Sequence, residues 1–270
     1  LVIAEEAHES GSDSYYKVMQ ACKSADYRLA LTATPFMRAN AEDNMRLLGC
    51  TGEIGIRISE KQLIDLGILA KPFFKYRSCE KPPKLFASTR WPRSYTLGIV
   101  ENRSRNECIV AEAKKAAHYK LPVLILVQHK SHGKILEKML IEADIKGRFL
   151  FGEDNQKQRL ECLNALASGE IEALVATNIL DVGVDVPSIG LVILAGGYKA
   201  EVTLRQRIGR GLRAKKSGAN VAFILDFNDE GNMKLAEHAA TRKAIIMNTP
   251  GFKEGVLSAT QEFNYDLFSK

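Results

Sequence analysis

The sequence lacks the features that mark membrane-spanning, secreted or metal-knuckle proteins. No apolar run approaches the roughly 18 residues that a membrane-spanning helix needs. No two of the five cysteines form a Cys-x-x-Cys pair, which disfavours a zinc knuckle or a Cys-x-x-Cys redox motif. Their scattered positions also disfavour a disulfide framework. An odd, scattered set is typical of reduced thiols in a cytoplasm. With 270 residues, 46% of them hydrophobic and 26% charged, the chain should fold as one or two globular domains.

Positive charge is modest overall and concentrated locally. The formal charge is +6, from 38 basic and 32 acidic residues, which permits a polyanionic partner without demanding one. Residues 199–216, however, hold seven basic side chains and one acid, Glu201. His129 and His132 lie three residues apart with no flanking cysteine, so a solvated loop is a better interpretation of them than a metal site.

Short apolar runs alternate with helical patterns along most of the chain. The predicted strands are continuous rather than alternating runs, at 123–127, 173–176, 191–195 and 221–225, with a weaker candidate at 149–151. Helical spacing of apolar residues follows Ile109 and Leu160, and Gly169 is a plausible C-terminal cap. This order predicts a doubly wound α/β domain with a buried parallel sheet.

The first 70 residues resemble the tail of a second α/β domain. Strands are predicted at 1–4 and 27–32, with a helix at 12–22 between them, and Ser59-Glu60-Lys61-Gln62 is a capping-box pattern. Because the chain opens directly on an apolar run, we expect the start of this domain to be missing. The prolines of residues 71–96 indicate a connection between domains.

Two segments of the first 70 residues carry chemistry at predicted strand ends. Glu5-Glu6-Ala7-His8 places two carboxylates where open parallel sheets bind ligands, which suits a magnesium–phosphate site. The alternative is a solvated acidic turn. Thr32-Ala33-Thr34-Pro35 ends the next strand, and its hydroxyls could contact phosphate-site groups or simply end the strand in a turn.

Two more segments lie in the predicted second domain. Thr177 follows a strand, and Gly183 and Asp185 lie in a turn closed by proline, where glycine permits close approach of a ligand. In the basic segment, three arginines recur every third residue and would form one stripe on a helix, suited to phosphate oxygens; these are Arg207, Arg210 and Arg213. A solvated helix face is the alternative, which the interleaved glycines and Gln206 make less favoured.

Together and in this order, these segments resemble the conserved motifs of superfamily 2 helicases and translocases. Residues 5–8 look like a DEAH-type Walker B motif, 32–34 like motif III and 177–185 like motif V. Residues 206–213 match the Q-R-x-G-R-x-x-R pattern of motif VI, and 123–130 resemble motif IV more weakly. The spacing is most similar to phage and bacterial DNA helicases of the UvsW and restriction-motor kind.

The resemblance implies a fold, a set of ligands and a cellular setting. The fold would be α/β with RecA-like parallel sheets: the rear of an N-terminal lobe at 1–70, a connection at 71–96, a complete C-terminal lobe at 97–247 and a tail at 248–270. ATP and Mg²⁺ would bind between the lobes. The partner would be duplex or branched DNA, and the protein would be a monomer in the cytoplasm of a bacterial or phage-infected cell.

The resemblance also implies a role for each motif residue. Glu6 would polarise water and Glu5 would hold magnesium, with His8 beside them. Arg210 and Arg213 would act as arginine fingers, with Gln206 near the γ-phosphate. The remaining residues divide into two groups: Gly183, Asp185 and Arg207 at the nucleotide, and Thr32, Thr34 and Thr177 in lobe coupling or nucleic-acid contact.

The sequence departs from the family pattern in two places. Glu5 stands where the family has aspartate. The sequence also contains no G-x-x-x-x-G-K-[ST] loop, since Gln128 and Ile135 spoil the match around Gly133-Lys134. In the family that loop precedes the acidic motif, so we expect it upstream of Leu1 and expect the isolated chain to hydrolyse ATP poorly. The alternative is a non-catalytic nucleic-acid-binding or scaffold module, against which Glu6 and the arginine stripe argue.

Overall fold

The chain is organised as two compact units. The computed structural model describes all residues except 33–34, 36–40, 153–154, 178–188, 198–218 and 269–270. The units are Leu1–Ile58 and Ser59–Lys270, and each is described by itself below. Along the described residues, no helix is both long and apolar enough to cross a membrane.

The first unit is built on two parallel strands. Its elements are β1 (Val2–Glu5), η1 (Ala7–Gly11), α1 (Asp13–Ala21), β2 (Arg28–Leu31) and α2 (Ala41–Thr51). Its small core consists of Ala4, Ala7, Met19, Leu47 and Cys50. The opposite face of the strands is apolar and open, with Ile3, Leu29 and Leu31 exposed to 58%, 53% and 57%. The two strands and the first helix confirm the predicted elements of this region.

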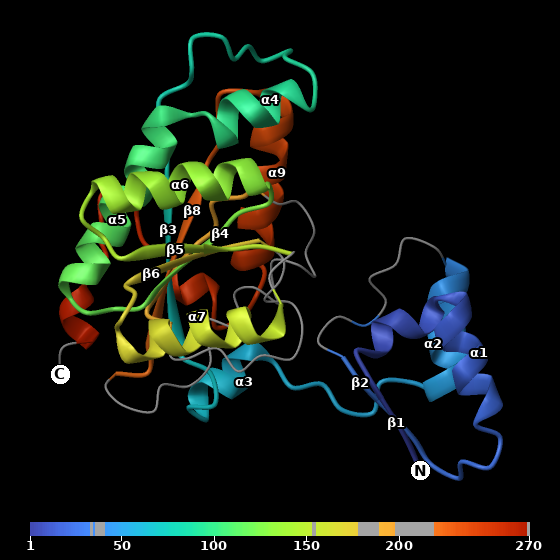
Figure 1. Cartoon of the computed structure of the whole chain (residues 1–270). Helices are drawn as coiled ribbons and strands as arrows, with labels where there is room; N and C mark the ends of the chain where they lie inside the picture. Colours follow the sequence, from blue (N-terminus) through green and yellow to red (C-terminus); the bar gives the residue numbers. More distant parts are fainter. Residues whose placement is uncertain (33–34, 36–40, 153–154, 178–188, 198–218, 269–270) are drawn as a thin grey trace. The chain divides into compact units, whose positions relative to one another are not determined.

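The second unit contains a six-stranded, fully parallel sheet (Figure 1). The strands are β3 (Lys71–Arg77), β4 (Val123–Leu126), β5 (Gly147–Leu150), β6 (Ala173–Ala176), β7 (Leu191–Ile193) and β8 (Val221–Phe227), in the spatial order β3-β8-β7-β4-β6-β5. The central strands are buried on both faces, which explains their continuous apolar runs. All five strands predicted from apolar runs are present, including the weak candidate that became β5.

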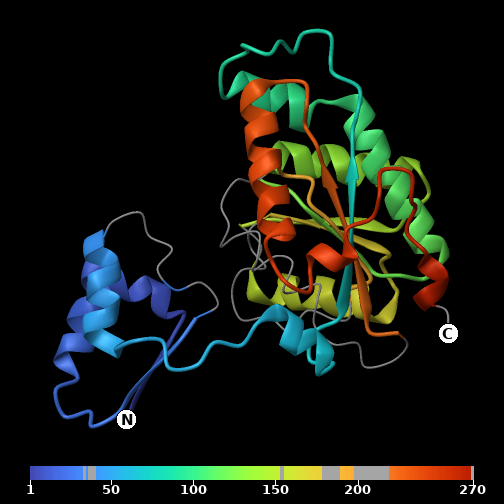
Figure 2. The same ribbon diagram turned by 180° about the vertical axis from the view of Figure 1, so that it is seen from behind.

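Helices cover both faces of this sheet. The unit contains α3 (Glu60–Asp65), α4 (Arg93–Tyr95), η2 (Thr96–Val100), α5 (Arg103–His118), α6 (Lys130–Glu142), α7 (Gln156–Ser168) and α9 (Met233–Met247). α5 and α6 pack with one face of the sheet, and α7 and the end of α9 contribute to the core on the other (Figures 1 and 2). Two predicted signals are confirmed: Ser59 forms a capping box with Gln62, and Gly169 caps α7 at φ +78°.

The sequence-based interpretation of residues 71–96 as a connection differs from the structure. Residues 71–77 form β3, which pairs with β8 along its whole length. Pro72, which has no N–H to donate, is tolerated because β3 lies at the edge of the sheet. The neighbouring residue Lys71 donates its N–H to the Asn220 carbonyl at 2.8 Å. The boundary between the units also falls at 58/59 rather than at 70, because α3 belongs to the second unit.

Residues 251–268 pack against the rest of the second unit. They include η4 (Lys253–Gly255) and η5 (Tyr265–Phe268), and Phe252, Phe263 and Tyr265 are buried. The Tyr265 hydroxyl donates to Oε1 of buried Glu112 at 2.8 Å. The Tyr265 side chain is therefore packed into the core of the second unit.

Candidate functional site

The acidic turn lies at the carboxyl end of β1. In the parallel register Glu5 stands opposite Leu31, so the residues that follow the two strands emerge at the same edge. Glu6 has φ +49°, a left-handed conformation that turns the chain sharply after the strand. Both glutamates are exposed, and the Tyr15 hydroxyl donates to the Glu5 carbonyl at 3.2 Å. The turn therefore presents two carboxylates from a fixed backbone.

His8 links this turn to the end of β2. Its Nδ1 lies 3.1 Å from Oγ1 of Thr32 and 3.4 Å from Oε2 of Glu6. The His8 side chain is only 11% exposed, whereas that of Glu6 is 58% exposed. The structure thus brings Glu6, His8 and Thr32 together beside Glu5, while Thr34 lies outside the described residues.

The predicted site residues of the second unit are only partly described. Thr177 follows β6 and its N–H donates to the Leu150 carbonyl at 3.3 Å, so its position is at the carboxyl edge of the sheet. The others fall on ranges that the structure does not describe: Gly183, Asp185, Gln206, Arg207, Arg210 and Arg213. Gly133 of the Gly-Lys pair lies within α6 against the Phe149 ring, as a helix residue rather than a phosphate loop.

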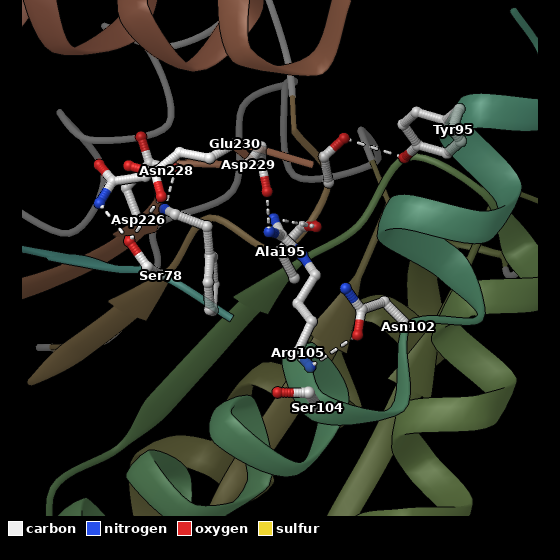
Figure 3. A network of polar contacts seen from close by, with 12 residues as sticks. Ser78, Tyr95, Asn102, Ser104, Arg105, Ala195, Asp226, Asn228, Asp229 and Glu230 are labelled. Carbon is white, nitrogen blue, oxygen red and sulfur yellow. Dashed lines mark hydrogen bonds and ion pairs between the residues drawn. The ribbon is translucent and has the colours of Figure 1, made fainter. Parts of the chain in front are cut away.

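A buried ion network, not anticipated from the sequence, lies at the carboxyl end of β8 (Figure 3). Arg105 of α5 pairs with Asp229, and Arg242 of α9 bridges Asp229 (3.1 Å) and Asp226 (2.9 Å). Burial raises the pKa of the Asp229 carboxyl, and the two arginines offset only part of that rise. For Arg242, burial lowers the pKa, but the two aspartates outweigh it and the net pKa is raised.

This network fixes the chain just before the predicted arginine segment. Arg105 Nη2 donates to the Ala195 carbonyl at 3.1 Å, and the Tyr95 hydroxyl donates to the Gly196 carbonyl at 2.9 Å. The Arg105 guanidinium also lies 3.9 Å from the Phe227 ring centroid. Helices α4 and α5 therefore hold the chain after β7 at the sheet edge. Only the two aspartates after an apolar strand hinted at this from the sequence.

The two neighbouring histidines have different environments. The prediction of a solvated loop is wrong for His132, which is fully buried in α6 with Nε2 2.9 Å from Oδ1 of Asn106. Burial, with smaller contributions from Arg105 and His129, lowers the pKa of His132 to about 3. His129 is exposed and its ring lies 4.7 Å from that of Tyr95. Among the described residues, no group of three or more side chains is placed to hold a metal ion.

Comparisons with known proteins identify the second unit. The family model "Helicase conserved C-terminal domain" matches residues 105–215, which begin in α5 and run through the predicted arginine segment. The fragment structure of a putative HsdR subunit of a type I restriction enzyme from Vibrio vulnificus has a TM-score of 0.65 at 19% identity, covering 88% of this chain and 45% of that one. The Hef helicase domain of Pyrococcus furiosus has a TM-score of 0.56 at 14% identity, covering 89% and 73%.

The second unit carries, at residues 105–215, a conserved helicase C-terminal domain.

Sequence relatives of the chain include viral and cellular proteins. Putative helicase 22 of Sulfolobus islandicus filamentous virus is 25% identical, over 84% of this chain and 42% of its own length. The ATP-dependent DNA helicase uvsW of Enterobacteria phage T4 is 23% identical, over 98% and 53%. The pre-mRNA-splicing ATP-dependent RNA helicase PRP28 of Cryptococcus neoformans is 35% identical, over 47% and 17%. The chain therefore spans about half or less of the length of these relatives.

Within the helicase lobe, the RecA-like sheet explains the placement of the described motif residues. Thr177 and His129 follow β6 and β4, which are neighbours in the sheet, so both lie at its carboxyl edge. Ligands of open parallel sheets bind at this edge. The predicted RecA-like fold of the second unit is confirmed by the parallel sheet and by its structural neighbours.

Proposed function

We propose that this chain belongs to an ATP-dependent motor that acts on DNA, with ATP hydrolysed between two RecA-like lobes. The observation that carries the proposal is the joining of the acidic turn to Thr32 through His8, at the end of two parallel strands. The Glu6 carboxylate contacts the His8 imidazole, which contacts the Thr32 hydroxyl. A movement of Glu6 on binding or hydrolysis of ATP would therefore move the backbone that follows β2.

The first unit supports the idea of a larger N-terminal lobe. Ile3, Leu29 and Leu31 form an apolar strand face that the described residues of this unit leave open. Open apolar faces of this kind are what further layers of a RecA-like domain would bury. We therefore propose that residues 1–58 are the rear part of an ATPase lobe.

The residues of the acidic turn fit magnesium and ATP. Exposed carboxylate oxygens at a strand end are the donors that Mg²⁺ prefers, and Glu5 would hold the ion, which when bound neutralises phosphate charge. Glu6 would accept a proton from the attacking water and orient it. Arg210 and Arg213 would stabilise charge on the transferred phosphoryl group. Because Glu5 is one methylene longer than the family's aspartate, we expect slow turnover.

DNA is favoured over RNA by the extent of the sequence matches. The relative named a DNA helicase aligns with 98% of the chain, whereas the RNA helicase PRP28 aligns with 47%. With 98% of the chain aligned, the longer match extends into both units. We therefore propose duplex or branched DNA as the substrate, a monomeric motor, and Thr177 as one of its DNA contacts.

The test is nucleic-acid-stimulated ATP hydrolysis by the natural gene product that contains these residues, with duplex DNA, single-stranded DNA and RNA compared. We expect DNA to stimulate turnover, and Glu6→Gln and Arg210→Ala each to reduce kcat by about 10³-fold with DNA affinity retained. Lys114→Ala, on the exposed side of α5, is the control. Nucleic-acid binding without turnover would instead favour the non-catalytic module, and equal turnover in Arg210→Ala would refute the arginine-finger role.

A further inference from the structure

The loop between β3 and α4 carries exposed aromatic rings. Phe86 is 61% exposed and Trp91 is 46% exposed, and Met233, whose N–H donates to the Ala87 carbonyl at 3.3 Å, is 73% exposed. The loop projects from the end of the lobe beyond the start of α9 (Figures 1 and 2). Large apolar side chains gathered on one projecting loop mark an interaction surface.

One buried side chain forms hydrogen bonds to several carbonyls of the loop. Asn232 is 1% exposed, and its Nδ2 lies within hydrogen-bond distance of three loop carbonyls, at 2.9 Å (Phe86), 2.9 Å (Ala87) and 3.0 Å (Thr89). Its Oδ1 at the same time accepts from the first backbone N–H groups of α9. The exposed rings are therefore preorganised, which lowers the entropic cost of binding a partner.

Trp91 is the outer member of a cluster of aromatic rings that are tilted against one another. Its ring centroid lies 5.0 Å from that of Tyr95 and 5.7 Å from that of His238, and Tyr95 in turn lies 4.7 Å from His129. Tyr95 is buried, while His129 follows β4 in the stretch that resembles motif IV. This ring cluster thus connects the projecting loop to the carboxyl edge of the sheet.

Positive charge surrounds these rings. Residues 80–93 contain four basic side chains, all exposed, and one acid; the basic ones are Lys81, Lys84, Arg90 and Arg93. Within the part of the chain that the structure describes, none of the four forms an ion pair. Neighbouring carboxylates therefore do not neutralise these four positive charges, which can contact a polyanion.

We propose that residues 81–93 bind single-stranded nucleic acid, with a base stacked on Trp91 or Phe86 and phosphates contacting Lys84, Arg90 and Arg93. Exposed rings interleaved with cations are the arrangement that recognises unpaired bases on a charged backbone. Duplexes present no free base face, so the loop would hold the separated strand. This proposal rests on the proposed function and adds to it a contact outside the helicase motifs.

The test uses the fact that Trp91 is the chain's only tryptophan. The 270-residue chain is titrated with a fluorescein-labelled dT20 oligonucleotide for anisotropy and with the unlabelled oligonucleotide for tryptophan emission. We expect emission to be quenched with the same midpoint as the anisotropy change. Inorganic polyphosphate, which has charge but no bases, should compete for the site without comparable quenching.

Variants separate stacking from charge. Trp91→Ala and Phe86→Ala should each weaken dT20 binding about 5- to 150-fold, as expected for loss of one stacked base, and Trp91→Phe should restore most of it. Arg90→Glu should weaken binding and reduce its salt dependence. Lys114→Glu is the control, since it makes the same change of charge in α5, away from the loop. This variant should bind dT20 like the native chain. Because Phe86, Arg90 and Lys114 are exposed, their variants should melt like the native chain by circular dichroism, and Trp91→Phe keeps a ring against Tyr95, which separates loss of packing from loss of binding.

The outcomes distinguish this proposal from the proposed function. If dT20 binds while Trp91 emission and the Phe86→Ala affinity stay unchanged, the strand binds elsewhere and the loop proposal is wrong, although the motor proposal stands. If dT20 does not bind the 270-residue chain, the loop proposal fails, and the ATPase assay of the natural gene product decides the motor proposal separately. If Trp91 emission changes with protein concentration and not with nucleic acid, the surface contacts a second copy of the chain and the loop proposal is overturned.

Discussion

Acidification should destabilise the helicase lobe through one buried histidine. His132 has no exposed surface and its pKa is lowered to about 3, against about 6.5 for a histidine in an unfolded chain. Because the folded-state pKa is the lower of the two, the unfolded chain takes up the proton first. The stability due to neutral His132 is therefore present above pH 6.5 and is lost as the pH falls toward 3.

The magnitude follows from the two pKa values. Between pH 7 and pH 5 the free energy of unfolding should fall by about 2 kcal/mol from this group alone, and below pH 6 by about 1.4 kcal/mol per pH unit. This pH window lies above the usual carboxyl pKa values, so most acids stay ionised across it. Arg105 and His129 also lower the pKa of His132 and so act in the same direction.

Urea unfolding at pH 7 and pH 5, followed by the emission of Trp91, measures this loss. His132→Gln keeps an amide that can reach Asn106, but this amide does not titrate. In this variant the fall in the free energy of unfolding between pH 7 and pH 5 should therefore be smaller by about 2 kcal/mol than in the native chain. His118→Gln, which changes an exposed histidine at the end of α5, should keep the native loss. Equal losses in the native chain and His132→Gln would refute the assignment.

Three further substitutions test the packing around the site by the same urea unfolding. Arg105→Met leaves the Asp229 carboxylate buried with one partner fewer, and should cost about 3–5 kcal/mol; a cost below 1 kcal/mol would contradict a tight ion network. Tyr265→Phe removes a hydrogen bond to a buried carboxylate and should cost about 1.5–3 kcal/mol, whereas no change would mean that the C-terminal segment does not dock. Gly133→Ala places a Cβ on the Phe149 ring and should cost about 1–3 kcal/mol, unless the ring can move aside.

Local patterns in the sequence predicted the central sheet because they reflect burial. The strands β4, β6, β7 and β8 are buried on both faces and therefore read as unbroken apolar runs. β3 escaped prediction because it contains Pro72 and the charged Lys75. That lysine is 1% exposed, and its ammonium is paired with Glu262, almost two hundred residues away, at 2.5 Å. No local pattern can show such a partner.

In the site too, features set by local sequence patterns could be predicted, whereas features set by distant partners could not. The meeting of Glu6, His8 and Thr32 could be expected, since parallel pairing of two predicted strands brings their carboxyl ends to one edge. The Arg105–Asp229–Arg242 network could not, because its members come from two helices and a loop whose packing the sequence does not specify. The exposed aromatic loop around Trp91 could not be predicted either, because the prolines of this stretch indicated only a connection between domains.

The pairing of β3 with β8 has a consequence for synthesis on the ribosome. β3 is the first strand of the sheet in the chain, but its only strand partner in the described sheet begins about 150 residues later. At roughly 5–20 residues per second, β3 would wait about 8 to 30 s for that partner. During this interval Phe73 and Phe74 would be open to chaperones or to other nascent chains, so the lobe should be most prone to misfolding before β8 emerges.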